Sequence, residues 1–449
     1  MPFLSIRSSD IQKDGLGEDR ATARKKPRGE KVRQTSIMRR GPLTGALLLF
    51  LSLTPSLAAQ QVRPTLGFES ASHATLAPAN AAGAVSRLYV AGVSNAGLVV
   101  HDRTGNVLSR KTWPELFGTD QYDTRIVYDE RFDRWVILAL VAGDSIFFSF
   151  AISTTNDPRG GWKTFAFDIV DAQFTRLALT RDFIVMATNV NHGTQTRLLL
   201  LDRNAATYAN DRHTLRGHTI DIPDMAPVAT DDTTAALYLM VTRNSRTDLY
   251  ELSGSFLENI GGLDSPLQLG VDLTDSAPQP GGPFLDAGRS GIANAIYRNG
   301  YVYAVHSGWD VEESRSSIAF WAFDPARRLA HQEVISSPDG DWLAYPSVAV
   351  NSAGIAAVVF SVFSENRYVT SGYSYALPLQ PMTPPALLKE GEGPHPLTAW
   401  GKYNTIVVDP LNDTDFWGVT SHAETGGRWG TWWSRLEVEA PPKRRAVRH

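Results

Sequence analysis

Short apolar runs separated by polar turns recur along this chain at an even spacing. Runs of four to eight residues, rich in Val, Ile, Tyr, Phe and Trp, end at Asp-Pro, Asn-Gly, Asp-Gly or Gly-Gly pairs, a pattern typical of β-strands and their turns. Equivalent runs begin at Arg125, Leu177 and Val228, so the repeat is 52 and then 51 residues long. A four-stranded propeller blade needs ~40 to 50 residues.

Seven copies of the repeat can be followed to the C-terminus. They begin near residues 87, 125, 177, 228, 292, 346 and 406. We therefore predict an all-β fold, a seven-bladed β-propeller of four-stranded antiparallel blades. Residues 62–69 are predicted to pair with the last blade and close the ring, which removes the open sheet edges that invite aggregation.

The N-terminal part reads as a targeting segment. Arg39 and Arg40 precede an apolar stretch at 43–53 and the small residues at 56–59, which together predict a signal peptide. This stretch is short for a membrane span, although an uncleaved anchor is the alternative. We divide the chain into a disordered or wrongly annotated extension (1–37), a signal peptide (38–59), one propeller domain (60–440) and a basic tail (441–449). The mature protein is expected to be secreted or periplasmic, without a stable membrane span.

Composition narrows the chemistry. The net charge of −4 argues against a nucleic-acid partner, and the absence of cysteine excludes disulfides, thiol catalysis and Cys-ligated zinc. Glycine-rich phosphate loops, His-Glu-x-x-His helices and Gly-x-Ser-x-Gly elbows are also missing from the sequence. We expect a monomer.

Several segments carry a resemblance to a known group. Asp123–Asp129, Ala151–Pro158, Tyr345–Val350 and Trp400–Asn404 resemble exported bacterial proteins with a sialidase-like propeller. The resemblance covers most of the mature chain and implies fold and export rather than a reaction. Lys402 stands where that group tends to carry an acid. The segment from Ser153 to Trp162 has the wrong spacing for a sialidase Asp-box, and we interpret it as a hairpin turn.

Propeller geometry indicates one functional face. Loops that lead into each innermost strand and loops that join the second and third strands lie around the channel mouth, where arginine forks bind carboxylates or sulfates and aromatic rings stack on sugars. The candidate ligand-binding residues are Tyr122, Asp123, Arg125, Arg176, Arg289, His306, Trp309, Asp310, Tyr345, Trp400, Tyr403, His422 and Glu424. The alternative is structural: the arginines pair with Asp123, Asp129 or Asp171, and the rings pack between blades.

Catalysis and metal binding have weaker support. Asp310 or Glu312 with Asp123 or Glu424 would offer the two carboxylates of a glycosidase, but no catalytic residue is assigned. The oxygen-rich loop 409–415 is a calcium candidate, although an Asx turn explains it and we expect no cofactor. The prediction is a secreted binding module for a glycan or cell-envelope component, with a protein partner as another option. The alternatives are a secreted glycoside hydrolase or lyase, and a structural envelope scaffold.

Overall fold

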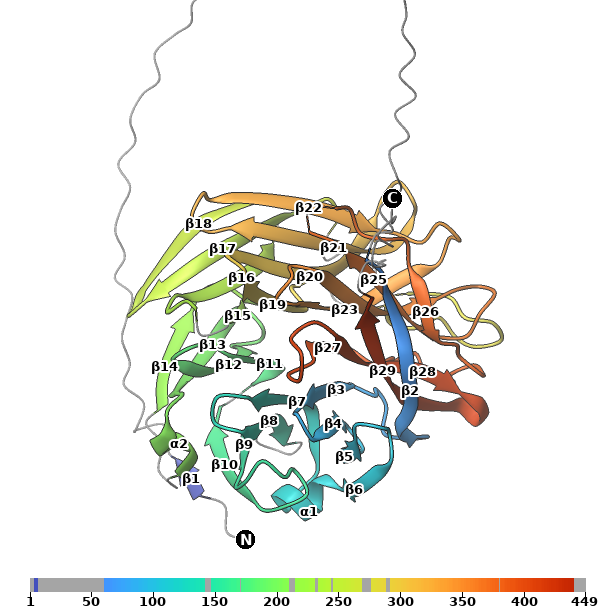
Figure 1. The fold of residues 1–449 in the computed structure, drawn as a ribbon. Coiled ribbons are helices and arrows are strands. Elements are labelled where there is room, and N and C mark those ends of the chain that lie inside the picture. The colour runs from blue at the N-terminus through green and yellow to red at the C-terminus, as the bar shows by residue number, and fades with distance from the viewer. Residues whose placement is uncertain are drawn as a thin grey trace, which may run out of the picture.

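The computed structural model is a ring of β-sheets with little helix (Figure 1). It describes residues 4–6, 60–141, 147–169, 171–209, 215–230, 233–243, 245–268, 276–287, 291–378 and 380–439. The predicted signal peptide, the basic tail, Arg289 and all but residues 4–6 of the predicted extension lie outside these ranges. Within these ranges, no helix has both the length and the apolar character needed to cross a membrane.

Within the described residues, the strands form seven four-stranded antiparallel units, which we number as blades in chain order. Blade 1 consists of β3 (Ala82–Val85), β4 (Tyr89–Ser94), β5 (Gly97–Asp102) and β6 (Val107–Lys111). Blade 2 consists of β7 (Gln121–Asp129), β8 (Arg134–Val141), β9 (Phe147–Ser153) and β10 (Trp162–Asp168). Blade 3 consists of β11 (Gln173–Leu179), β12 (Phe183–Val190), β13 (Gln195–Asp202) and β14 (Leu215–Ile220). Blade 4 consists of β15 (Ala226–Thr230), β16 (Leu237–Arg243), β17 (Arg246–Ser253) and β18 (Phe256–Asp264). Blade 5 consists of β19 (Asn294–Arg298), β20 (Tyr301–Asp310), β21 (Arg315–Asp324) and β22 (Leu329–Ile335).

Blades 6 and 7 complete the ring. They are β23 (Trp342–Val350), β24 (Ala356–Phe363), β25 (Thr370–Ala376) and β26 (Ala386–Lys389); and β27 (Thr405–Val408), β28 (Phe416–Glu424), β29 (Arg428–Val438) and the N-terminal β2 (Val62–His73). Outside the blades, α1 (Trp113–Phe117), α2 (Ala205–Ala209) and a 3-10 turn (Thr425–Gly427) are short, and β1 (Leu4–Ile6) pairs in parallel with β10.

The innermost strands are arranged in a ring around the axis of the propeller (Figure 1). Strands β3, β7, β11, β15, β19, β23 and β27 each pack on the next, and β27 packs back on β3. The innermost strands of blades 4 and 5, β15 and β19, even pair in parallel. The predicted all-β propeller is confirmed.

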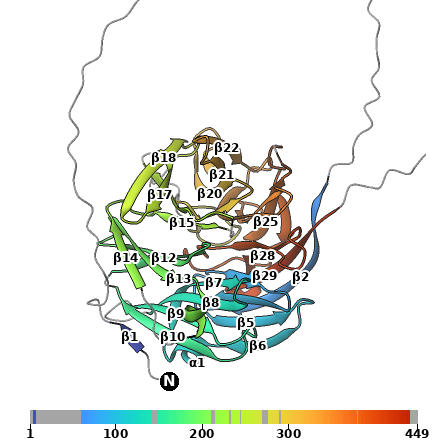
Figure 2. The same ribbon diagram turned by 60° about the vertical axis from the view of Figure 1, so that its left-hand side comes forward.

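Strand β2 closes the ring by joining the two ends of the propeller. It runs antiparallel along β29, with Val62 opposite Val438 and His73 opposite Trp429, as Figure 2 shows at the edge of the disc. The prediction that residues 62–69 pair with the last blade is confirmed. This pairing covers the outer edge of β29, which would otherwise present unpaired backbone groups.

The core lies between the blades because each sheet is buried on both faces. In β24, neighbouring residues point to opposite sides: Val358 packs with Ile318 of blade 5, and Val359 packs with Phe416 of blade 7. Successive side chains of a strand alternate between the two faces of the sheet. Each apolar run therefore contributes to two cores, which explains why the runs are almost continuously apolar.

Candidate functional site

A repeated backbone corner leads into the innermost strands at the channel mouth. Asp123, Phe174, Asp224 and Tyr345 occupy equivalent positions with φ of 53°, 59°, 58° and 57°. Left-handed backbone is unfavourable for bulky residues such as Phe and Tyr, and such strain clusters at functional sites. In blades 2, 3, 4 and 6, the residue two positions further along lines the channel; these residues are Arg125, Arg176, Ala226 and Ser347. Blades 2 and 3 thus place arginines where blades 4 and 6 place small side chains.

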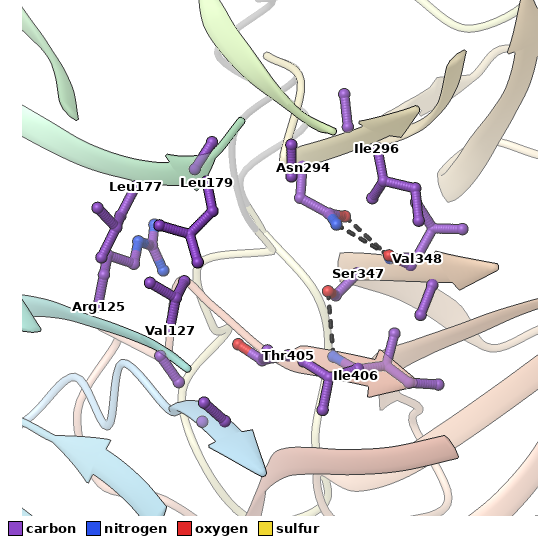
Figure 3. A pocket seen from close by; sticks show the side chains of 18 of the residues that line it. Arg125, Val127, Leu177, Leu179, Asn294, Ile296, Ser347, Val348, Thr405 and Ile406 are labelled. Atoms are coloured by element: carbon purple, nitrogen blue, oxygen red, sulfur yellow. Dashed lines mark hydrogen bonds between the residues drawn. The ribbon is translucent and has the colours of Figure 1, made fainter. Parts of the chain in front are cut away.

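Two cavities follow the channel axis. We call the cavity of about 350 Å³ the mouth cavity and the cavity of about 420 Å³ the channel cavity. The channel cavity is lined mainly by aliphatic side chains, among them Val127, Leu177, Leu179, Ile296, Val348 and Ile406 (Figure 3). The side chains of Arg125, Arg176, Lys402 and Tyr403 border both cavities. A cationic and aromatic constriction therefore lies between the two cavities.

Arg125 enters the constriction without a carboxylate partner. Its Nε donates a hydrogen bond to the Thr175 carbonyl at 3.1 Å, and its guanidinium carbon lies 3.0 Å from the centroid of the Tyr403 ring. Among the described residues it forms no ion pair, because Asp123, Asp129 and Asp171 all bond elsewhere. Burial lowers the pKa of Arg125, but an arginine remains charged at neutral pH. Arg125 lines both cavities.

Arg176 is the second guanidinium of the constriction. Its side chain is 13% exposed, and its Nη2 donates to Asp224 Oδ1 at 3.3 Å. The same oxygen accepts a hydrogen bond from Asn189 Nδ2 at 2.6 Å. Nη1 of Arg176 is buried and has no hydrogen-bond partner within the described ranges. Arg176 and Arg125 are close enough for the positive charge of Arg176 to contribute to the lowered pKa of Arg125.

The segment 400–404 crosses the mouth from blade 7. The Lys402 backbone N–H donates to Asn80 Oδ1 at 3.0 Å, and Asn404 Nδ2 donates to the Tyr345 carbonyl at 2.9 Å. Lys402 Nζ lies 5.1 Å from the centroid of the Phe174 ring in blade 3. This segment therefore brings a third cation to the site.

Tyr403 supplies a hydroxyl donor between the arginines. The hydroxyl is buried and has no hydrogen-bond partner in the described part of the chain. Burial raises the pKa of Tyr403, and the nearby Asp123 carboxylate raises it further. The hydroxyl therefore keeps its proton over the physiological range and can donate it to Asp123 or to an acceptor that enters the site.

Two carboxylates at the mouth, Asp123 and Asp224, already serve as acceptors. Asp123 Oδ2 accepts the Thr175 N–H at 2.7 Å, and Asp224 is shared by Arg176 and Asn189. The Tyr345 hydroxyl donates to the backbone carbonyl of Asp286 at 2.8 Å. These contacts orient the site: Asp224 pairs with Arg176, while Arg125 is left without an ion-pair partner among the described residues.

Four of the predicted residues meet at the mouth cavity, and others lie away from it. Arg125, Arg176, Tyr345 and Tyr403 line it. Of the others that the structure describes, Asp123 lies beside it, while Tyr122 packs against the core shared by blades 2 and 3. Trp400 is 1% exposed and packs on Phe363 and His395, as the structural alternative expects.

The prediction of a polar loop from His306 to Asp310 is wrong. These residues form the end of strand β20, and the turn occupies the residues that follow, because the β20–β21 ladder continues to Asp310 opposite Arg315. His306 is fully buried, and burial lowers the pKa of His306 to about 4. Trp309 joins Gln268 through an isolated bridge, and Asp310 accepts the N–H groups of the turn. None of the three lines the mouth cavity.

His422 and Glu424 were also expected in a loop but lie in strand β28. They face the outer seam of blade 7, beside Glu69 of β2, and neither lines the two cavities. The mouth is also lined by Phe174, Asp224, Asp286 and Lys402, which are not among the candidate ligand-binding residues. Phe174 and Asp224 align with Asp123 in the repeat, so alignment of the blades was the available signal.

The oxygen-rich loop 409–415 uses its carboxylates inside the protein. Asp409 accepts from Arg103, the Trp417 indole and the Leu411 N–H, and Asp415 accepts from Arg435. Asn412 Oδ1 accepts the N–H groups of residues 414 and 415, which is Asx-turn geometry. The loop is built as a turn.

Strand pairing and the closed ring define this chain as a β-propeller protein. No protein-family profile and no curated protein sequence matches it. Among solved structures, it is similar to the AfRom2 CNH domain at 10% identity and a TM-score of 0.38, over 84% of this chain and 98% of that one. It is also similar to the WD40 domain of SCAP from fission yeast (9%, TM-score 0.36, 79% and 80%) and to an exo-β-1,3-galactanase from Phanerochaete chrysosporium (11%, TM-score 0.34, 85% and 99%).

Proposed function

We propose that this chain is an exported binding module that holds a carboxylate-bearing glycan or cell-envelope component at the channel mouth. The observation that carries the proposal is the pair of neighbouring guanidinium groups at the mouth. Arg125 forms no ion pair within the described residues, and Arg176 pairs through Nη2 with Asp224 but keeps a buried Nη1 without a hydrogen-bond partner there. Like charges placed together favour the binding of an anion between them. Guanidinium forks match the geometry of a carboxylate, and Lys402 and the Tyr403 hydroxyl add a charge and a donor.

Aromatic rings at the mouth support a sugar rather than a simple anion. Phe174, Tyr345 and Tyr403 line the same cavity as the arginines. Rings of this kind stack on the apolar faces of sugars, while charged groups hold the carboxylate. A cavity of about 350 Å³ has room for one sugar unit with its acidic group. An acidic sugar of the sialic or uronic type fits this combination and agrees with the sialidase-like resemblance of the sequence.

The contacts of the acids favour binding over hydrolysis. A glycosidase needs two carboxyl groups free to donate and accept protons or to attack the sugar. At this mouth, Asp123 is bonded to the Thr175 backbone and Asp224 to Arg176 and Asn189. A structural scaffold would fill its axis with side chains, whereas a channel cavity of about 420 Å³ borders the constriction. Binding is therefore the function we propose.

A glycan array that pairs each acidic glycan with its neutral counterpart tests the proposal. We expect binding of carboxylate-bearing glycans that weakens with added salt and falls at least tenfold in Arg125→Ala. Arg197→Ala, in strand β13 of blade 3, is the matched control and should bind as wild type does, because Arg197 lines neither cavity and donates to Thr219. Equal binding of acidic and neutral glycans, or no effect of Arg125→Ala, would contradict the proposal.

A further inference from the structure

A second polar cluster lies on the outer seam where the two ends of the chain meet. Glu69 comes from β2, and His422 and Glu424 come from β28, so the cluster joins strands on either side of β29. One nitrogen or oxygen atom of each residue lies within 4.8 Å of the others. The cluster is separate from the mouth and channel cavities, because none of its three residues lines them.

Gly430 creates the space in which these side chains meet. It lies in β29 between His422 of β28 and Ser72 of β2. A Cβ atom at this position would meet Glu424 Oε1 and would lie 2.6 Å from His422 Cε1. The register of β2 also shifts between Glu69 and Ser72, which re-aims the strand at this point. The seam is therefore shaped to bring an imidazole and two carboxylates together.

His422 is an unsatisfied donor and acceptor inside this cluster. Its side chain is 0% exposed, and neither ring nitrogen makes a hydrogen bond within the described residues. Nε2 nevertheless lies 3.3 Å from Glu69 Oε1, so the ring faces the cluster. Buried polar groups in native proteins are normally paired, and one without a partner requires an explanation. A bound cation would supply the missing partner.

We propose that Glu69, His422 and Glu424 bind a divalent transition metal ion, with zinc as the best fit. Zinc binds imidazole nitrogen and carboxylate oxygen, often with three protein ligands and a water molecule. The two carboxylates balance the charge of the ion. Glu69 is 47% exposed, which gives the ion a path from solvent. At ligand distances of about 2.0–2.2 Å the ligand atoms must approach one another by roughly an ångström, which side-chain rotation of the glutamates permits.

The neighbours of the cluster hold the glutamates in place. The Ser72 hydroxyl donates to Glu424 Oε2, and Arg428 Nε lies 3.4 Å from the same oxygen. Supporting contacts of this type orient metal ligands. Lys389 Nζ, from blade 6, lies 3.5 Å from Glu69 Oε1 and 2.6 Å from Glu392. Lys389 therefore competes with the ion for Glu69 and can retain Glu392 when the ion binds.

The ion would fasten the ring closure. Glu69 lies near the N-terminal end of the propeller and His422 near its C-terminal end, so a shared ion cross-links β2 to β28 across β29. Binding to the folded chain alone raises its stability in proportion to the logarithm of metal concentration. At 100 times the dissociation constant, we expect the Tm to rise by about 2–4 °C.

Calorimetric titration of metal-stripped protein with Zn²⁺ at neutral pH tests the site. We expect one ion per chain, with at least tenfold weaker binding in Glu69→Gln, an exposed substitution that should leave the fold intact, and in His422→Gln. His306→Gln is the matched control, because His306 is equally buried but belongs to blade 5 and should leave zinc affinity unchanged. Lys389→Met should tighten binding several-fold, an effect of opposite sign.

Cobalt absorption gives a readout that does not depend on the variants. Co²⁺ bound to wild-type protein should show the visible absorption of an ion held by nitrogen and oxygen ligands, and excess Zn²⁺ should remove it. Absence of stoichiometric Zn²⁺ binding in the wild type would overturn the proposal. Equal zinc affinity in the wild type, Glu69→Gln and His422→Gln would also overturn it.

Discussion

Two arginine sites on blades 2 and 3 differ in what neutralises the charge. At the corner between the blades, Arg203 donates from Nε and Nη2 to the two oxygens of Asp129, each at 2.8 Å, and its side chain is 7% exposed. The Tyr208 hydroxyl donates to the same carboxylate. At the channel mouth, Arg125 has the Thr175 carbonyl and the face of Tyr403, without an ion pair in the described part of the chain.

The comparison separates a structural arginine from one that is available to a ligand. Removing charges from water costs several kcal/mol per ion, and a bidentate carboxylate offsets that cost. The bidentate hydrogen bonds between Arg203 and Asp129 offset this desolvation cost within the fold. The contacts of Arg125 offset less of this cost. Arg125 also lines a cavity that a ligand can enter. The same residue type therefore indicates stability at one position and recognition at the other.

The largest expected effect on stability comes from Asp129, the carboxylate of the structural pair. Asp129→Asn should lower the free energy of unfolding by about 3–5 kcal/mol, because Arg203 is left buried beside a neutral group. Urea denaturation measures it. The control is Glu130→Gln, where the partly exposed pair with Arg87 should change stability by less than about 1 kcal/mol. A loss in Asp129→Asn no larger than in the control would remove the distinction between the two arginine sites.

A buried histidine makes the stability of the fold depend on pH. Burial lowers the pKa of His306 to about 4 from its usual 6.5. His306 takes up a proton below about pH 6.5 in the unfolded chain but only near pH 4 in the folded chain. The contribution of the neutral, buried ring to the free energy of unfolding is therefore complete above pH 6.5 and is lost as the pH falls toward 4. Its size is about 3 kcal/mol.

Urea denaturation at pH 7, 5.5 and 4.5 measures this contribution. His306→Gln, which cannot titrate, should flatten the pH dependence of unfolding. The control is His192→Gln, because His192 has a side chain that is 92% exposed and should leave the slope unchanged. The same slope in wild type and His306→Gln would show that the buried ring is not responsible.

The fold was predictable because its signals are local. Alternating apolar runs and turn pairs specify each four-stranded unit, and the closure by β2 follows from the need to cover an edge. The strand boundaries were harder: the long β20–β21 ladder took in His306 and Trp309, which local polarity had placed in a loop. Hydrogen-bonding across a hairpin can thus extend strands through polar residues.

The site was predictable only where it repeats. Arg125 and Arg176 occupy the same position in successive blades, so sequence alone could pair them. Lys402 reaches Phe174 across the channel, and Glu69 reaches His422 across β29. These contacts join residues far apart in the chain and depend on where whole blades sit. The burial of Trp400 is of the same kind, since it depends on the loops that cover it.

The smallest effect on stability, and the sharpest test of the comparison, is expected from Arg125→Met. Methionine retains most of the aliphatic length and removes a charge that no described carboxylate neutralises, so the free energy of unfolding should change by less than about 1 kcal/mol or should rise. Arg203→Met, measured in the same way, should lose several kcal/mol because it leaves Asp129 buried without its cation. If Arg125→Met were as destabilising as Arg203→Met, both arginines would be structural. A stable Arg125→Met variant that no longer binds acidic glycans would assign the mouth arginine to recognition.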